Sequence, residues 1–280
     1  MGTEVKITPT AIIDAAKNAP WEIDIEPFRV APHIYYVGNR WVGSFLIETS
    51  EGLVLIDTAV FETAYLLLES IRKLGFEPKQ IKKILLSHSH MDHDGAARQM
   101  KELTGAEIYL SKEDEEWRKR PEADMTDSGF KIVDYTVDRF YDDNEPIVMG
   151  DVVIHTKLSA GHTPGTTSFF VDVKDENGEK LTWAMHGGVG VNTINTAYLE
   201  KVNLPISLQE TFLNGCEEMK AIHVDVCTPS HPSHSDMLER VPEDRMDYRP
   251  FVDANKWPAF LDERAEALRK VIADGKYDVR

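Results

Sequence analysis

Residues 84–93 read Ile84-Leu85-Leu86-Ser87-His88-Ser89-His90-Met91-Asp92-His93, an apolar run followed by four side chains that can bind metal. The run from Lys82 to Leu86 predicts a buried strand. A loop that leaves the end of such a strand can aim imidazoles from alternating positions at one point. We therefore expect His88 and His90 to share one metal ion.

Asp92 and His93 lie at the start of a predicted helix, Asp94–Leu103, so the turn before this helix directs them at a second ion. A histidine-rich surface loop is the alternative, but the third histidine and the aspartate favour a metal site. Neutral imidazole nitrogen and carboxylate oxygen suit zinc, iron or manganese. Because the motif contains no cysteine, it does not predict a closed structural zinc site.

Two further motifs place histidine inside a stiff turn, Gly161-His162-Thr163-Pro164-Gly165 and Ser230-His231-Pro232-Ser233-His234. Proline fixes its own backbone angle and glycine allows angles that other residues resist, so the imidazoles are held in one direction. With residues 88–93, these motifs resemble the metallo-β-lactamase superfamily from about Pro32 to about Asp236. The resemblance implies an α/β fold, a four-layer αββα sandwich with the metal site at the edge of the two sheets.

The resemblance also implies the ligands of each metal ion. The first ion is expected to bind His88, His90 and His162, and the second Asp92, His93 and His231. His234 is the competing residue for the last position. We favour His231 because it directly follows the apolar run Val224–Cys227 and a turn, whereas His234 lies farther along the chain.

One departure from many hydrolases of this superfamily is the absence of a metal-bridging aspartate, because residues 183–190 contain no carboxylate. In this the chain is similar to the third subclass of metallo-β-lactamases, in which solvent hydroxide joins the two metals. His186, within this segment, either contacts substrate or is a buried histidine bonded to backbone. Asp57 ends an apolar strand where the family places a carboxylate that orients metal-bound histidines, and a simple strand-end turn is the alternative.

These ligands predict acyl hydrolysis of a small molecule. A divalent ion lowers the pKa of bound water from roughly 15.7 to about 7, and Asp92 is expected to orient the attacking solvent. The predicted function is a β-lactamase-like, dinuclear metal-dependent hydrolase of an amide, ester, lactone or thioester, with zinc as the expected metal and iron or manganese as alternatives. Cys216 and Cys227 lie outside the motifs and are expected to be buried rather than nucleophilic.

Two alternatives to β-lactamase-like activity stay open. A thioesterase resembling glyoxalase II, or a lactonase, is the first, and the missing bridging aspartate counts against both. The second belongs to another class, a metal-binding or redox protein without hydrolysis. The flavodiiron oxygen reductases share this sandwich, but they carry a glutamate where His90 stands.

The composition and net charge of the chain restrict the kinds of partner that it can bind. The chain has 280 residues, 42% of them hydrophobic, and a formal net charge of −17. We expect one domain over residues 1–280, with a lead-in at 1–30 and a helical extension at 245–280. The negative charge disfavours nucleic acid and anionic membranes. Without an apparent secretory signal and with two cysteines, the sequence favours the cytoplasm.

Several segments could complete the site or the assembly. The stretch Ser111–Asp143 is predicted to be either a lid over the metals or a solvated connection. The loops at Arg40-Trp41, around Trp117 and at Asn192–Leu199 are expected to shape the substrate pocket, which the sequence does not specify further. The predicted terminal helix Pro258–Ala273 has an apolar side that packs on the domain or on a second copy of the chain, as in a homo-oligomer.

Overall fold

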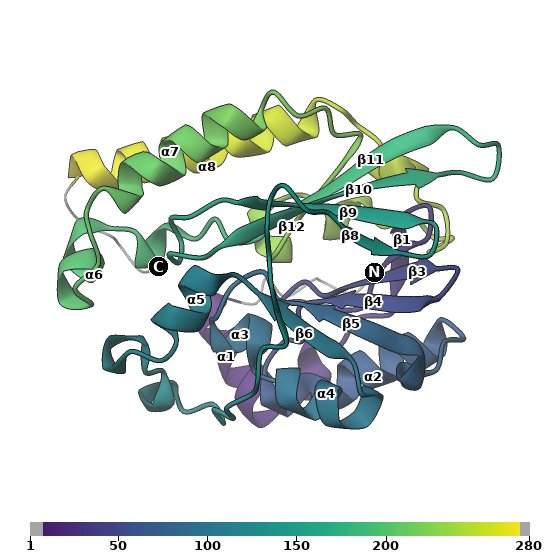
Figure 1. Cartoon of the computed structure of the whole chain (residues 1–280), viewed down its shortest axis with the longest axis horizontal. Coiled ribbons are helices and arrows are strands. Elements are labelled where there is room, and N and C mark those ends of the chain that lie inside the picture. Colours follow the sequence, from purple (N-terminus) through teal and green to yellow (C-terminus); the bar gives the residue numbers. More distant parts are fainter. Residues whose placement is uncertain (1–7, 275–280) are drawn as a thin grey trace.

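The computed structural model describes residues 8–274. Two β-sheets pack face to face, and helices cover both outer faces (Figure 1). The fold is therefore an α/β, αββα sandwich, and the prediction from the sequence is confirmed.

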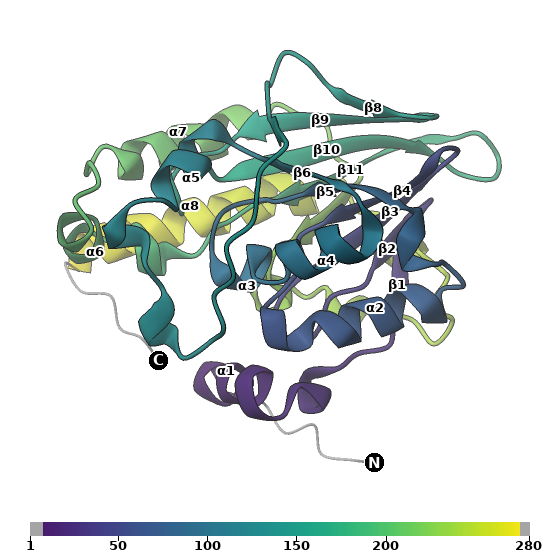
Figure 2. The ribbon, with the colours of Figure 1, turned by 60° about the horizontal axis from the view of Figure 1, so that its bottom comes forward.

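The first sheet has seven strands in the order of the sequence, β1 to β7. Strands β1 to β4 pair antiparallel, and β4, β5, β6 and β7 pair parallel. The strands are β1 (Phe28–Ala31), β2 (Ile34–Tyr36), β3 (Phe45–Thr49), β4 (Gly52–Ile56), β5 (Ile81–Leu85), β6 (Glu107–Leu110) and β7 (Arg139–Phe140). On the outer side of this sheet lie α1 (Pro9–Asn18), α2 (Ala64–Lys73), α3 (Met91–Asp94) and α4 (Ala97–Thr104) (Figure 2).

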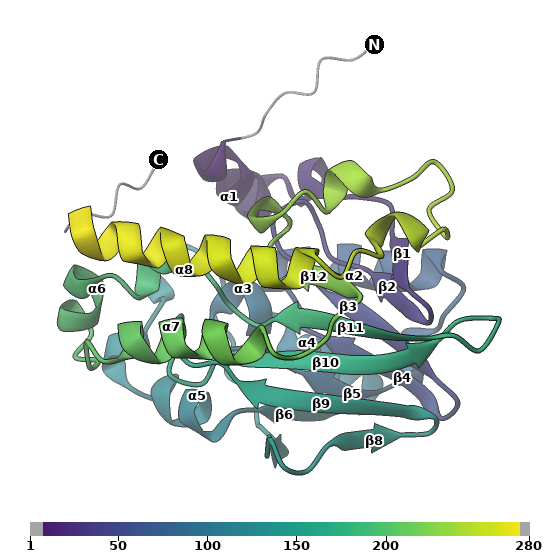
Figure 3. The ribbon, with the colours of Figure 1, turned by 90° about the horizontal axis from the view of Figure 1, so that it is seen from above.

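The second sheet has five strands in the order β12-β11-β10-β9-β8. These are β8 (Ile147–Met149), β9 (Val152–Leu158), β10 (Thr167–Lys174), β11 (Lys180–His186) and β12 (Val226–Pro229). Helices α7 (Leu208–Met219) and α8 (Lys256–Asp274) lie across its outer face, and α6 (Thr196–Lys201) lies beyond them (Figure 3). Phe260, Leu261 and Leu268 of α8 are buried in a cluster with α7, so this apolar side packs on the chain itself.

The sheets are held together by a large apolar core between their inner faces. Phe28, Tyr36, Phe45 and Trp183 are completely buried there, and Phe45 packs against Trp183 with ring centroids 5.2 Å apart. Buried aromatic pairs of this kind add stability beyond the area they remove from water. The core fixes the relative position of the strand ends from which the histidine motifs extend.

The structure differs from the sequence-based expectation for one helix. The helix expected at Asp94–Leu103 is divided into α3 and α4, because the backbone leaves helical angles at Ala96 (φ −98°, ψ 8°), and the Ala96 amide donates to the Ala59 carbonyl (3.1 Å) rather than within a helix. Asp92 and His93 consequently lie inside α3 rather than in the turn before a helix.

The segment Ser111–Asp143 is anchored to the body of the protein by a few buried side chains, while more than half of its residues are exposed. It begins with α5 (Lys112–Trp117), which Ser111 caps through its hydroxyl. Trp117, Phe130 and Tyr135 are each more than nine-tenths buried. Among residues 8–274, none of the helices combines the length and the apolar character needed to span a bilayer.

Candidate metal centre

Three loops at one edge of the sandwich bring the predicted ligands together. They follow β5, β9 and β12, and they carry residues 86–93, His162 and His231. The six predicted side chains form two groups of three, and within each group the donor atoms lie within 4.8 Å of one another. The groups are His88, His90 and His162, and Asp92, His93 and His231.

The first group has the spacing of ligands on one ion. Nδ1 of His90 lies 3.1 Å from Nε2 of His162, and the His88 ring centroid lies 4.8 Å from that of His90. Two nitrogens bound at about 2.0–2.1 Å to one tetrahedral ion lie about 3.3 Å apart. The imidazoles therefore fit a single metal ion.

The second group has similar dimensions. Nε2 of His93 lies 3.1 Å from Nε2 of His231, and the latter nitrogen lies 3.3 Å from Oδ2 of Asp92. His234 belongs to neither group within residues 8–274, although its ring centroid lies 5.3 Å from that of His231. The geometry thus favours His231 over His234.

Hydrogen bonds on the far side of the rings orient the imidazoles. Nδ1 of His162 donates to the Gly190 carbonyl (2.7 Å), and Nδ1 of His231 donates to the Trp41 carbonyl (2.8 Å). A carbonyl oxygen only accepts, so each ring keeps the Nε2 lone pair free for a metal.

His88 gives a further sign of a missing partner. Its Nδ1 lies 3.0 Å from the Ser87 hydroxyl, while its Nε2 is buried and has no hydrogen-bond partner within residues 8–274. Buried polar atoms are normally paired, and an orphan of this kind calls for a water molecule or an ion. The residues present fit a metal pair.

Asp57 supports both halves of the site from behind. This completely buried carboxylate accepts hydrogen bonds from the Ser87 amide (2.7 Å), the Ser87 hydroxyl (2.7 Å) and Nδ1 of His93 (2.8 Å). It therefore orients His93 directly and His88 through Ser87. The orienting position expected for Asp57 is the one that it occupies.

Asp114 supports the first group in the same way, and sequence reasoning did not single it out. Its completely buried carboxylate accepts from the Ser89 amide (2.8 Å), the Thr163 hydroxyl (2.8 Å) and the Gly165 amide (2.6 Å). Ser89 stands between His88 and His90, whereas Thr163 and Gly165 follow His162. Asp114 thus ties together the two loops that supply the first group.

The glycine-rich turn at residues 187–190 packs against the first group. A Cβ added to Gly188 would lie 2.7 Å from the His162 ring, and one added to Gly190 would lie 2.9 Å from it. These glycines let the backbone pack directly on the imidazole. His186 is buried, accepts from the Gly188 amide (3.2 Å) and does not line the cavity described below, so it occupies a structural position.

Burial keeps the first group of imidazoles neutral. It lowers the pKa of His90 to about 4 and, with the neighbouring histidines, places the pKa values of His88 and His162 well below their ordinary range. Burial opposes ionisation of Asp92, but the adjacent His93 and His231 outweigh it and hold the pKa of Asp92 low. Neutral imidazoles and an ionised carboxylate are the forms that bind metal.

A cavity of about 490 Å³ opens onto both groups. Arg40, Trp41, Asn192 and Tyr198 line it, as expected from the sequence. In the region around Trp117, the Trp117 side chain is buried and does not reach the cavity. Apolar side chains from distant elements also line the cavity, namely Ile12 and Ile13 of α1, Met91 of α3 and Met125.

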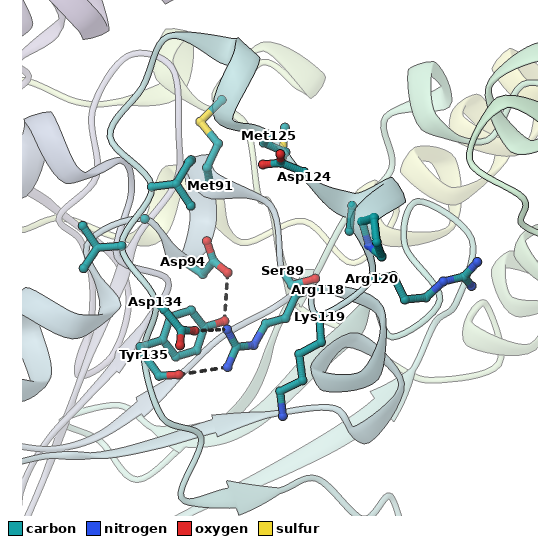
Figure 4. A pocket seen from close by; sticks show the side chains of 15 residues that line it. Ser89, Met91, Asp94, Arg118, Lys119, Arg120, Asp124, Met125, Asp134 and Tyr135 are labelled. Carbon is teal, nitrogen blue, oxygen red and sulfur yellow. Dashed lines mark hydrogen bonds and ion pairs between the residues drawn. The ribbon is translucent and has the colours of Figure 1, made fainter.

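A second cavity, of about 530 Å³, shares Met91 and Met125 with the first (Figure 4). At its base the Tyr135 hydroxyl donates to Asp94 (2.8 Å), and the Arg118 guanidinium lies over the Tyr135 ring, 4.2 Å from its centroid. Asp94 directly follows His93 in α3. The segment Ser111–Asp143 therefore holds the helix that carries part of the second group.

Comparisons with known proteins agree with this geometry. Residues 42–178 match the family model described as the metallo-beta-lactamase superfamily. The chain is 27% identical over 126 residues to a probable metallo-hydrolase, YqgX, of Bacillus subtilis, covering 43% of this chain and 56% of that protein. It is 26% identical over 170 residues to an N-acyl homoserine lactonase of a Bacillus species, covering 50% of this chain and 62% of that protein. The matches span little more than half the length of these curated relatives.

A solved structure is similar over nearly the whole chain. BJP-1, a subclass B3 metallo-beta-lactamase of Bradyrhizobium japonicum, superposes with a TM-score of 0.82 at 27% sequence identity. The similarity covers 93% of this chain and 98% of that one. His231 lies outside the segment matched by the family model.

Proposed function

Because this chain belongs to the metallo-beta-lactamase superfamily, we propose that it is a dinuclear metal-dependent hydrolase that cleaves an amide, ester, lactone or thioester bond in a small molecule. The resemblance found in the sequence, including that to the third subclass, is confirmed. One observation carries the proposal, namely two groups of three metal-binding side chains side by side at the floor of an open cavity. A β-lactam amide is the first substrate class to test.

The six predicted ligands would divide between two ions. Nε2 of His88, Nδ1 of His90 and Nε2 of His162 would hold the first, and a carboxylate oxygen of Asp92 with Nε2 of His93 and of His231 the second. Five imidazoles and one carboxylate form a donor set typical of zinc, and iron or manganese fits the same atoms. We propose zinc as the native metal.

When bound, such a metal pair supplies an acidified water molecule and a Lewis acid that polarises the substrate carbonyl. The chain's own residues position the reactants. Asp92 is a hydrogen-bond acceptor at the cavity floor, where it orients water for attack. Asp57 and Asp114 hold the ligand loops in place, and Met91 and Met125 add apolar surface to the cavity.

A lactonase is the second candidate, because the curated relatives include N-acyl homoserine lactonases. The glycine-rich turn at residues 187–190 argues against it, since no carboxylate is available there to bridge the metals. The cyclic ester of a lactone and the cyclic amide of a β-lactam nevertheless require the same polarisation and attack, so both belong in one substrate panel.

We also propose that residues 1–280 form a single domain, with the lead-in at 1–30 contributing α1 to the cavity and the extension at 245–280 contributing α8 to the cover of the second sheet. The buried free thiols of Cys216 and Cys227 support a reducing compartment such as the cytoplasm.

The test is to reconstitute the full chain with zinc, manganese or iron and to measure bound metal and turnover of nitrocefin, acyl-homoserine lactones and S-lactoylglutathione. We expect about two metal ions per chain and hydrolysis of nitrocefin. His90→Ala should lose metal and activity, whereas His155→Ala, which removes an exposed histidine of β9, should keep both. A His90→Ala variant with full activity, or wild-type protein that binds no metal, would show that the proposal is wrong.

A further inference from the structure

The cavity above the metal centre contains a guanidinium, that of Arg40, and we propose that it binds a carboxylate of the substrate. This inference rests on the proposed hydrolase function and names the substrate class, an acyl compound that carries a carboxylate beside an apolar group. Histidines aside, Arg40 and Asp92 are the charged side chains that line the cavity within residues 8–274. Asp92 belongs to the metal centre, so Arg40 is the residue available to an anion.

Arg40 has no intramolecular partner that would occupy it. Its side chain is exposed, and its guanidinium makes no hydrogen bond or ion pair with the part of the chain that the structure describes. Arg118, in contrast, is engaged by Glu115, Asp134 and the Tyr135 carbonyl. A guanidinium offers five donors in a planar fork that matches a carboxylate, and in Arg40 these donors are available.

The backbone that carries Arg40 is fixed relative to the metal centre. The Arg40 amide donates to the Ile23 carbonyl (2.9 Å), and the buried Asn39 side chain accepts from the amides of Trp41 (2.8 Å) and Val42 (2.9 Å). The next carbonyl, that of Trp41, accepts from His231. Arg40 is therefore the neighbour of a residue, Trp41, that bonds directly to a metal-binding histidine. This fixed position suits a side chain that positions substrate.

The other side chains that line the cavity indicate which chemical group of the substrate lies next to its carboxylate. Apolar side chains line the cavity from five different parts of the chain: Ile12, Ile13, Trp41, Met91, Met125 and Val189. Helix α1 keeps its place through a small apolar cluster with Val60 and Phe130, and Trp41 stacks on the Phe130 ring (centroids 5.6 Å apart). The cavity consequently offers an apolar surface next to one cation.

The overall charge does not provide this selectivity. A chain with a formal net charge of −17 repels anions at long range, so an anionic substrate requires a specific local cation. Charge-assisted, bidentate pairing with Arg40 supplies that contact.

Two stable probes separate the carboxylate from the apolar group, N-decanoylglycine and its neutral analogue N-decanoylglycinamide. Isothermal titration calorimetry of the zinc-reconstituted full chain should show the acid binding about tenfold more tightly than the amide, the difference typical of one exposed charge-assisted contact. Arg40→Ala should abolish this preference, and Arg40→Lys should restore part of it because the charge returns without the fork.

Arg72→Ala is the matched control, because Arg72 is an exposed arginine of α2 that does not line the cavity. It should keep the full preference for the acid. Equal affinity for the two probes, binding of neither, or a preference that survives in Arg40→Ala would overturn the assignment. Failure of the hydrolase proposal would appear separately, as absent turnover of every substrate in the panel, because the binding measurement does not depend on turnover.

Discussion

Replacing Asp114 tests whether a buried carboxylate outside the ligand set holds the first metal-binding group together. Its three hydrogen bonds come from two loops that are far apart in sequence, and all three lie between 2.6 and 2.8 Å. Burial raises the pKa of Asp114 to about 6, even though these hydrogen bonds favour the ionised form. Asp114 therefore fixes both loops although burial is unfavourable for its ionised form.

The expected loss of unfolding free energy follows from the hydrogen-bond donors that lose Asp114 as their acceptor. In Asp114→Ala the amides of Ser89 and Gly165 stay buried without an acceptor, at about 1–3 kcal/mol each, or about 2–6 kcal/mol of unfolding free energy together. The Thr163 hydroxyl keeps Thr166 as a partner at 2.8 Å. Asp114→Asn retains one acceptor oxygen, so we expect roughly half that loss.

The loss of orientation should also appear in metal binding. Mutation of groups that orient metal ligands typically costs about 10–100-fold in affinity. We expect Asp114→Asn to lower the affinity of the first group for zinc by a factor within that range. The affinity of the second group, Asp92, His93 and His231, should stay the same. Competition with a chromophoric chelator measures the affinities, and urea unfolding of the same samples measures stability.

Asp134→Ala provides the control from the same segment, because the Asp134 side chain is 87% exposed and its ion pair with Arg118 is worth about 0–1 kcal/mol. It should leave zinc affinity unchanged. An Asp114→Asn protein that is less stable yet binds both zinc ions like the wild type would refute the idea that Asp114 positions the ligands.

Three other outcomes are expected. His231→Ala should reduce bound zinc from about two ions to about one per chain while His234→Ala should not, and elemental analysis showing the reverse would exchange their roles. Burial raises the pKa of both Cys216 and Cys227 to about 12, so the thiols of the folded protein stay protonated at pH 8. They should therefore react with a disulfide reagent only when the protein unfolds. Fast labelling of the folded protein would contradict their burial. Asp57→Asn should weaken binding of both zinc ions, because Asp57 orients His93 directly and the first group through Ser87. Chelator competition measures both affinities, and a loss at one ion alone would show that the Ser87 link has no effect.

The ligands could be predicted from the sequence because each belongs to a short motif with restricted backbone. His162 lies between glycine and proline, and residues 88–93 follow a strand that the hydrophobic pattern identifies. Asp114 could not be found in this way. It stands among Glu113, Glu115 and Glu116, and nothing in that acidic run distinguishes the one side chain that is completely buried from its neighbours. The signal that exists, a serine three residues earlier, predicts a helix start and not a buried acid.

The shape of the cavity was also only partly predictable. Arg40 and Trp41 were expected to line it because they lie in a loop next to a strand of the predicted sheet, and they do. The contribution of α1 was not expected, because Ile12 and Ile13 reach the cavity through tertiary packing of a helix that the family core does not require. The burial of Trp117 was not predictable either, because no local pattern in the sequence shows which aromatic side chains tertiary packing covers.

The arrangement of strands explains why two aspartates suffice to hold the site. Strand β5 is parallel to both of its neighbours, β4 and β6, so the carboxyl ends of all three strands meet at one edge of the sheet. Asp57 directly follows β4, and Asp114 lies just beyond the end of β6. Each therefore reaches the loop after β5 from one side, and both accept from residues that alternate with the ligands, Ser87 and Ser89. The metal-binding loop is clamped by its neighbouring strands, whereas Ile12, Ile13 and Met125 line the cavity from α1 and the segment after α5 and belong to neither metal-binding group. We expect substitutions of these three side chains to change the substrate preference without displacing the metal ligands.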